Sequence, residues 1–393
     1  MSERVLVTGV AGFIGSHVAR VALLAGLAVR GTVRGNSYGV EKAVPGVEVV
    51  QMDLLNVTEA DLAAAMSGCN YLAHVASPFP GTDVTEEEMK VAVEGTAKVL
   101  RAAAAANVKR ILLTSSVAAI GGSADKTKGT AARPYTGADW SPDAMTASYS
   151  VSKTQAEKGA WTLAEELGLD MTTIHPSFVN GPMLLARAPT STAMAKRILE
   201  GDMPVRTRRH RLESDHSYPT TRIRPPSHSY LTPVPTHSPL TWRRDSCDAQ
   251  AVPAIGMNVC GVNDVAEAHV KALLNPSTKG QRLIVASGNL LMTDLAVAIQ
   301  VAHGADGWPI RTLPIPWVGM WLYSFFDKQA ASVLPLWKKE SHYDVAATEK
   351  LLGRALQPPM EAALEMAASI VELGVATRPG SKAKAPGYPK AEM

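Results

Sequence analysis

The stretch 5–15 constrains the fold of this chain more than any other. A short aliphatic run, Val5-Leu6-Val7-Thr8, ends in three glycines spaced three apart, and apolar residues then recur at helical spacing. Glycine allows positive φ and close backbone approach to a ligand, and the start of a helix attracts phosphate. The pattern therefore predicts a strand, a tight turn and a helix that hold a dinucleotide. A strand-to-helix turn without a ligand is the alternative. The glycines are Gly9, Gly12 and Gly15.

The composition is that of a soluble globular protein, with 46% hydrophobic and 19% charged residues in 393. Such a length allows one large domain or two smaller ones. Three cysteines without paired spacing argue against a disulfide framework or a zinc site. The first strand begins at once, so we expect no signal peptide, and the apolar run 317–326 is too short to span a bilayer. We expect a cytoplasmic protein.

Strand-like and helix-like segments alternate along most of the chain. This alternation predicts the α/β class: a Rossmann-type, doubly wound parallel sheet with a smaller C-terminal substrate-binding lobe. After the first strand, the expected strands are 28–33, 47–52, 71–75, 110–115, 171–175 and 282–286. The expected later helices are 61–66, 85–106, 148–167, 264–274 and 293–302.

These segments suggest a division of the chain into domains. We expect an NADP-binding Rossmann domain over 1–182, completed by about 257–290. The substrate-binding lobe would then comprise 183–204 and 291–377. Residues 378–393 are rich in Lys, Pro and Gly and predict a flexible tail.

A tyrosine and a lysine four residues apart, Tyr149 and Lys153, are the first candidate catalytic groups. On a helix this spacing places both on one face. A nearby ammonium favours the phenolate and lowers the pKa of the tyrosine, which can then exchange a proton with a carbonyl or alcohol oxygen. A solvent-facing Tyr/Lys pair without function is the alternative.

Serines close the predicted strand 110–115, in the motif Thr114-Ser115-Ser116. Parallel sheets bind ligands at the carboxyl ends of their strands, so a serine hydroxyl there could hold a substrate carbonyl against the tyrosine. A polar strand end leading into a loop is the alternative. The glycine turn, the serines and the Tyr/Lys pair occur in the order that a dinucleotide-dependent enzyme requires.

In these motifs the chain resembles the extended short-chain dehydrogenases/reductases, within the NAD-dependent epimerase/dehydratase superfamily. The branch that it most resembles contains dihydroflavonol reductases and fungal ketone/aldehyde reductases. The resemblance covers most of 1–200 and 253–375. The matching motifs are Thr8-Gly9-Val10-Ala11-Gly12-Phe13-Ile14-Gly15, Asp53-Leu54, His74-Val75-Ala76-Ser77-Pro78, Thr114-Ser115-Ser116, Tyr149-Ser150-Val151-Ser152-Lys153, His175-Pro176-Ser177 and Asn263-Asp264-Val265-Ala266-Glu267-Ala268-His269.

The resemblance assigns a role to each motif. It makes Tyr149 the proton donor, Lys153 the residue that lowers the tyrosine pKa and binds the nicotinamide ribose, and Ser116, rather than Ser115, the carbonyl-orienting group. The glycines would line the pyrophosphate, Asp53 and Leu54 the adenine, and Pro176 the nicotinamide. The expected catalytic set is Ser116, Tyr149 and Lys153, and the expected cofactor-binding set is Gly9, Gly12, Phe13, Ile14, Gly15, Arg34, Asp53, Leu54, Ala76, Ser77, Tyr149, Lys153 and Pro176.

The end of the second predicted strand distinguishes the two nicotinamide cofactors. A site selective for NAD places an acid there to bind the ribose hydroxyls. This chain reads Thr32-Val33-Arg34-Gly35-Asn36 instead. Because an arginine can form a charge-assisted fork with a 2′-phosphate, we expect NADP(H). A surface arginine without a ligand is the alternative.

The segment 205–252 has no counterpart in the family. It holds eight arginines but no lysine, six prolines and no apolar periodicity, which predicts an irregular, disordered insertion. Removing it joins 201–204 to 253–256 in a family-like run, so a translated intron is an equal alternative. Its four histidines, His210, His216, His228 and His237, lack the spacing of metal ligands.

The sequence thus predicts an NADPH-dependent oxidoreductase that reduces an aldehyde, a ketone or a dihydroflavonol-like compound to an alcohol. We expect a small-molecule substrate and neither nucleic acid nor membrane as a partner, because the chain outside 205–252 is nearly neutral. A sugar-nucleotide epimerase or dehydratase, and a non-catalytic NADP-binding regulatory protein, remain as alternatives. The substrate itself, the preferred direction, the stereochemistry and the oligomeric state cannot be derived from these residues.

Overall fold

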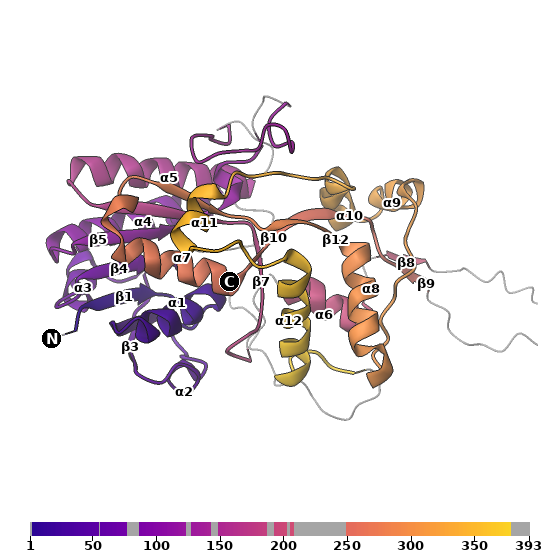
Figure 1. Ribbon diagram of the computed structural model, residues 1–393, viewed down its shortest axis with the longest axis horizontal. Coiled ribbons are helices and arrows are strands. Elements are labelled where there is room, and N and C mark those ends of the chain that lie inside the picture. Colours follow the sequence, from indigo (N-terminus) through magenta and orange to yellow (C-terminus); the bar gives the residue numbers. More distant parts are fainter. Residues whose placement is uncertain are drawn as a thin grey trace, which may run out of the picture.

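A parallel sheet of seven strands forms the larger part of the molecule, in the order β3, β2, β1, β4, β5, β6, β11 (Figure 1). The computed structural model describes residues 2–54, 56–76, 86–122, 127–142, 148–186, 192–202, 205–207 and 249–378. The strands are β1 (Arg4–Thr8), β2 (Ala28–Val33), β3 (Val47–Gln51), β4 (Tyr71–His74), β5 (Arg110–Thr114), β6 (Met171–Pro176) and β11 (Arg282–Val285). Each lies within a residue or two of its predicted range, and the predicted doubly wound fold is confirmed.

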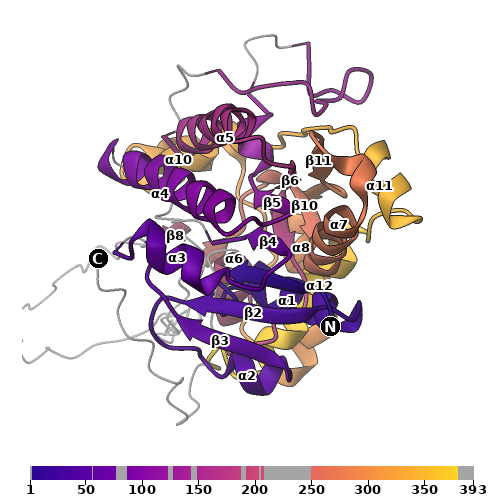
Figure 2. The same ribbon diagram turned by 90° about the vertical axis from the view of Figure 1, so that its left-hand side faces the viewer.

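Helices cover both faces of this sheet (Figure 2). Because β1 is buried on both sides, its side chains alternate between two cores. Val5 and Val7 pack under α1, α7 and their neighbours, and Leu6 packs under α3, α4 and α5. These helices are α1 (Phe13–Leu24), α2 (Val40–Ala43), α3 (Glu59–Ala65), α4 (Glu86–Ala105), α5 (Ser148–Glu166), α7 (Val262–Leu274) and α11 (Ala346–Leu352), and two short 3-10 turns are η1 (Val117–Ala119) and η2 (Pro276–Thr278).

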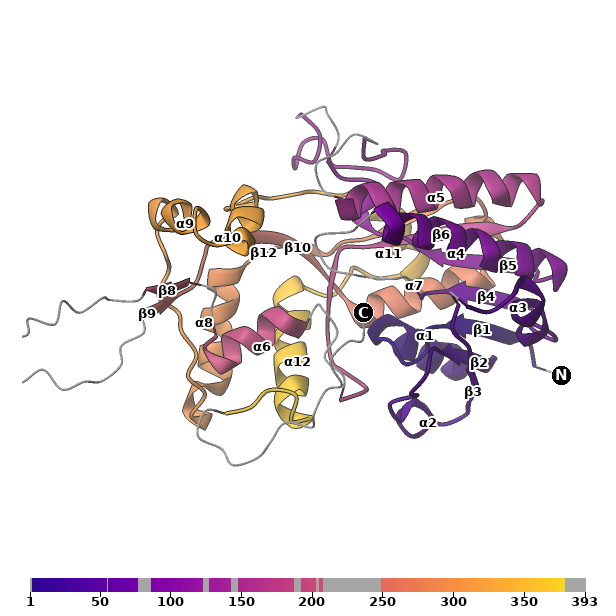
Figure 3. The same ribbon diagram turned by 180° about the vertical axis from the view of Figure 1, so that it is seen from behind.

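A smaller lobe lies beside the carboxyl ends of the strands (Figures 1 and 3). Its three-stranded sheet, β12-β10-β7, shares an apolar core with α6, α8 and α12. The elements are β7 (Phe178–Asn180), α6 (Thr192–Glu200), β10 (Gly256–Gly261), β12 (Gly288–Leu291), α8 (Met292–His303), η3 (Gly304–Asp306), α9 (Trp317–Ser324), α10 (Lys328–Val333), η4 (Leu334–Leu336) and α12 (Pro359–Glu372). The division into domains given above stays a proposal. No helix among the described residues is both long and apolar enough to cross a membrane.

Two short strands lie at the ends of the unusual segment 205–252. β8 (Val205–Thr207) and β9 (Ala249–Ala251) pair in antiparallel fashion, with Thr207 opposite Ala249. Residues 208–248, and with them the four histidines, lie outside the described part of the chain. The two described ends of the segment, Thr207 and Ala249, therefore lie next to each other.

This pairing predicts that residues 208–248 can be removed. A two-residue Asn-Gly turn closes an antiparallel pair, so we expect a variant with this turn in place of 208–248 to keep its Tm within about 3 °C of the full chain. Thermal unfolding followed by circular dichroism checks this. Loss of the cooperative transition would show that the segment is part of the fold.

A messenger that lacks these codons would support the intron interpretation, and their presence in every transcript would exclude it.

Candidate functional site

The glycine turn between β1 and α1 is tightly folded. Gly9 has a φ of +69°, which favours glycine, and its carbonyl oxygen accepts a hydrogen bond of 2.8 Å from the Gly12 N–H. A Cβ on Gly15 would lie only 2.3 Å from that carbonyl oxygen. The first turn of α1 reads Phe13-Ile14-Gly15-Ser16 and so carries no carboxylate. The turn thus forms a close-fitting cradle in front of a helix N-terminus, the arrangement that binds a pyrophosphate.

A threonine joins this turn to the end of β4. The Thr8 hydroxyl oxygen accepts hydrogen bonds of 3.0 Å from the backbone N–H groups of both Val75 and Ala76. The same hydroxyl is 2.8 Å from Nδ1 of His74 and donates its proton there, because its oxygen already accepts from two N–H groups and the histidine is neutral, burial and the Lys153 charge lowering its pKa to about 4. The ends of β1 and β4 are thereby fixed side by side, at the point where the strand order reverses.

Two of the predicted cofactor residues, Phe13 and Ile14 on α1, are partly buried, and a third, Ala76, follows β4 and adjoins the glycine turn. Phe13 packs against both main cores and meets His17 edge to face at 5.7 Å, and Ile14 packs against the core under α1. A Cβ on Gly9 would lie 3.0 Å from the Cβ of Ala76, which places Ala76 against the turn. Ser77, also predicted to bind the cofactor, lies outside the described residues.

The predicted adenosine-binding residues follow β2 and β3. Thr32 binds the glycine turn, since its carbonyl oxygen accepts from the Val10 N–H at 3.0 Å, and Arg34 follows two residues later with an exposed side chain. Asp53 and Leu54 follow β3, which pairs with β2. Both are partly buried, and the Asp53 carboxylate accepts a hydrogen bond of 2.7 Å from Asn56. Arg34, Asp53 and Leu54 therefore lie beyond the ends of two adjacent strands, on one side of the glycine turn.

The predicted catalytic residues come together beyond β5. Ser116 begins η1, where its hydroxyl oxygen accepts a hydrogen bond of 3.2 Å from the Ala118 N–H, and it also hydrogen-bonds to the Tyr149 hydroxyl. Lys153 lies one turn further along α5, with Nζ 5.9 Å from the centre of the tyrosine ring. Pro176 ends β6, which pairs with β5, so it lies at the same edge of the sheet.

The two serines beyond β5 have different partners. Ser115 is buried and donates a hydrogen bond of 2.6 Å to the Glu157 carboxylate. Ser116, in contrast, hydrogen-bonds to the tyrosine. The geometry therefore favours Ser116 over Ser115 as the group that orients a carbonyl.

The role of Lys153 in lowering the pKa of Tyr149 stays a prediction, and in the protein by itself the pKa of Tyr149 lies above its usual value. Burial raises the pKa of Tyr149 to about 12, and the hydrogen bond from Ser116 only partly opposes this. Loss of hydration destabilises the phenolate and so favours the protonated phenol. Burial also lowers the pKa of Lys153 to about 8, against the opposing charge of Glu157. At neutral pH the tyrosine is thus a protonated acid and the lysine a cation.

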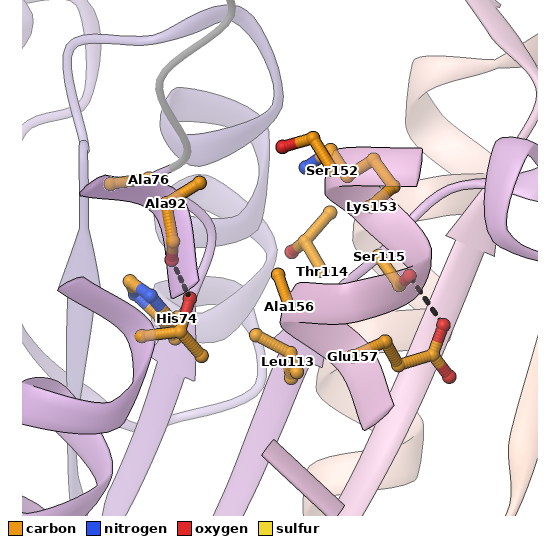
Figure 4. A pocket seen from close by; sticks show the side chains of 11 residues that line it. His74, Ala76, Ala92, Leu113, Thr114, Ser115, Ser152, Lys153, Ala156 and Glu157 are labelled. Carbon is orange, nitrogen blue, oxygen red and sulfur yellow. Dashed lines mark hydrogen bonds between the residues drawn. The ribbon is translucent and has the colours of Figure 1, made fainter. Parts of the chain in front are cut away.

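A small cavity lined by both polar and apolar side chains lies between α4, α5 and the ends of β4 and β5 (Figure 4). Lys153 and Glu157 line it from successive turns of α5, with the Glu157 carboxylate turned toward Ser115, and His74 and Thr114 line it from the strands. Glu157 is the residue of this site that the sequence analysis missed. Its position four residues after Lys153 was the available signal, because this spacing continues the helix face of Tyr149 and Lys153.

Comparison with known proteins defines the class to which this fold and site belong. The sequence model of the NAD dependent epimerase/dehydratase family matches residues 5–211, more than half of the chain. The chain belongs to this family.

Particular relatives are reductases. Cinnamoyl-CoA reductase 1 of Petunia hybrida is 35% identical over 207 residues, which are 50% of this chain and 60% of that protein. Dihydroflavonol 4-reductase of Zea mays is 36% identical over 212 residues, 51% of this chain and 59% of the relative. The match thus spans about three fifths of these relatives. It confirms the resemblance to the dihydroflavonol reductase branch.

Solved structures agree with the fold over nearly the whole chain. Yeast methylglyoxal/isovaleraldehyde reductase Gre2, crystallised with NADPH, is 22% identical, with a TM-score of 0.66 over 94% of this chain and 99% of that one. Vestitone reductase of alfalfa (Medicago sativa) is 21% identical, with a TM-score of 0.63 over 95% of this chain and 99% of its own. At this identity the likeness establishes the Rossmann-type fold.

Proposed function

We propose that this protein is an NADPH-dependent reductase that converts an aldehyde, a ketone or a dihydroflavonol-like carbonyl to an alcohol. The observation that carries the proposal is the hydrogen bond between Ser116 and Tyr149, at the same sheet edge as the glycine turn. Bound NADPH supplies the hydride. The names of the relatives support a carbonyl substrate, since cinnamoyl-CoA reductase and dihydroflavonol 4-reductase each act on one.

The residues present fit a dinucleotide. The cradle at Gly9, Gly12 and Gly15 has no room for side chains at Gly15, where a Cβ would collide with backbone, and it leaves the start of α1 open to phosphate. We assign the pyrophosphate to this cradle, together with Phe13 and Ile14. We further assign Arg34 to the 2′-phosphate, Asp53 and Leu54 to the adenine, Lys153 to the nicotinamide ribose and Pro176 to the nicotinamide. Ala76 and Ser77, which follow β4 in the sequence, complete the proposed cofactor-binding set.

The proposed chemistry of the chain's own residues follows from their protonation states. Ser116 and Tyr149 hold the substrate oxygen by hydrogen bonds. Tyr149, which is protonated at neutral pH, gives its proton to that oxygen as negative charge develops on it. The Lys153 cation stabilises the tyrosinate that remains.

A panel of carbonyl compounds tests this function. Purified full-length protein is incubated with NADPH and with aldehydes, ketones and dihydroflavonols, and NADPH consumption and alcohol formation are followed. We expect consumption that depends on both protein and carbonyl compound. Turnover of a sugar nucleotide without net NADPH consumption would instead support an epimerase, and tight NADPH binding without any turnover would support a regulatory binding protein.

A further inference from the structure

The carboxylate of Glu157 is buried at the centre of a polar cluster beneath the candidate catalytic residues. Its side chain is 1% exposed. It accepts hydrogen bonds from Ser115 Oγ at 2.6 Å, from His175 Nε2 at 2.9 Å and from Arg282 Nε at 2.7 Å. The donors come from the end of β5, from β6 and from β11, so one anion joins three strands to α5.

Glu157 is ionised at any working pH. Burial alone would raise its pKa, but the neighbouring His175 and Arg282 together hold the pKa of this carboxyl well below its usual range. The Arg282 guanidinium also donates to the backbone carbonyls of Gly137 and Asp139, at 2.8 and 2.6 Å, and stacks over Trp140. The Glu157 carboxylate is therefore held by the Arg282 guanidinium, whose own position is fixed by two backbone carbonyls and the ring of Trp140.

Lys153 shares the small cavity with this anion. Burial lowers the pKa of the lysine, and the charge of Glu157 opposes that change. Among the described groups beside Lys153, His74 on β4 and Tyr149 are neutral at pH 7, since burial lowers the pKa of the histidine to about 4 and raises that of the tyrosine to about 12. From α4 the cavity receives Ala92 and Thr96, which do not ionise. Among the described residues that line the cavity, Glu157 is the acid that can stabilise the ammonium.

We propose that Glu157 is a positioning residue, whose fixed carboxylate keeps Lys153 a cation beside Tyr149 and, through Ser115, holds the end of β5 that presents Ser116. This inference rests on the proposed function for its catalytic meaning. The electrostatic coupling itself is a property of the protein without cofactor. It can therefore be tested even if the protein reduces no carbonyl compound.

The direct test is the titration of Lys153 in the full-length protein. Lysine labelled with carbon-13 at Cε is followed by NMR against pH, and the Lys153 signal is assigned by its loss in Lys153→Arg. We expect the pKa of Lys153 to fall by about one pH unit in Glu157→Gln, because an anion that favoured the ammonium is removed. Glu165→Gln, an exposed acid two turns further along α5, should leave it unchanged. An unchanged Lys153 pKa in Glu157→Gln would overturn the proposal.

Two further variants distinguish the effect of the Glu157 charge on Lys153 from a purely structural role of the Glu157–Arg282 pair. Arg282→Lys keeps the cation but loses the planar fork, so a merely structural role predicts that it disturbs Lys153 as much as Glu157→Gln does. We expect it instead to leave the Lys153 pKa within about 0.3 units of the wild-type value. If Glu157→Gln does not fold, Glu157→Gln/Arg282→Gln removes both partners of the buried ion pair. The Lys153 pKa should fall there as well, but by less than in Glu157→Gln, because the positive charge of Arg282 is lost together with the anion.

Kinetics give a second readout. The Lys153 pKa of about 8 predicts that kcat is sustained below pH 8 and falls as the pH rises above it. In Glu157→Gln this alkaline limb should move to lower pH by the same amount as the NMR titration, with KM for the carbonyl compound little changed. A uniform loss of kcat without a moved limb would contradict the proposal. A wild-type protein without turnover would refute the proposed function and leave the NMR test intact.

Discussion

Replacement of Tyr149 by phenylalanine is expected to lower kcat for carbonyl reduction about 1,000-fold. The phenol is the group that hydrogen-bonds to Ser116 and, with a pKa of about 12, it is protonated throughout the working pH range. Phenylalanine keeps the ring and removes the proton that the developing alkoxide needs. Tyr149 also belongs to the expected cofactor-binding set, but the loss of one hydrogen bond should weaken NADPH binding by no more than about tenfold, far less than the effect on kcat.

Initial rates and a fluorescence titration with NADPH measure these two effects separately. Tyr71→Phe is the matched control: burial raises the pKa of its hydroxyl to about 12 as well, but the group donates to Glu3 at the amino ends of β1 and β4, away from the candidate site. It should retain full activity. Activity that survives in Tyr149→Phe would assign proton donation to another group.

Replacement of Arg34 by alanine is expected to weaken NADPH binding about 10- to 100-fold and to leave NADH binding nearly unchanged. The side chain is exposed beyond β2, two residues after the Thr32 carbonyl that binds the glycine turn. A guanidinium at this point has a 2′-phosphate partner in NADPH and none in NADH. Arg34→Asp should go further and favour NADH, since its carboxylate repels the phosphate and accepts from the ribose hydroxyls.

Calorimetric titration of each variant with both cofactors shows whether Arg34 binds the 2′-phosphate of NADPH. Arg101→Ala is a suitable control, because Arg101 is an exposed arginine on α4 that pairs with Glu59 at 3.0 Å. Equal binding of both cofactors by the wild type, or an equal loss of both in Arg34→Ala, would make the arginine structural and the assignment of NADPH wrong.

Much of the fold and part of the candidate site could be predicted from short sequence patterns. The run Val5–Thr8 identifies a strand buried on both faces, and the glycines that follow identify a turn with no room for side chains. The spacing of Tyr149 and Lys153 likewise places both on α5 without knowledge of the rest of the fold. Such features depend only on residues that are close together in the sequence, so they can be predicted without knowledge of the fold.

Other features depend on contacts between distant residues. Arg282 reaches Glu157 across 125 positions of sequence, and nothing local in either segment predicts the pair. The raised pKa of Tyr149 also follows from burial in the folded site, which the local Tyr/Lys spacing does not reveal. β10 was missed as well: it reads Gly-Met-Asn-Val-Cys-Gly and lacks both an apolar run and a regular alternation. Its burial comes from α12 and the lobe around it.

Transfer of label from NADPH tests the central claim of this account most directly. The protein is incubated with a carbonyl compound and NADPH that carries deuterium at the transferred position, and the alcohol is analysed by mass spectrometry. We predict one deuterium on the carbinol carbon and one NADPH consumed for each alcohol formed. Product without deuterium, or deuterium recovered in the cofactor with no net consumption of NADPH, would contradict the assignment of the site to carbonyl reduction.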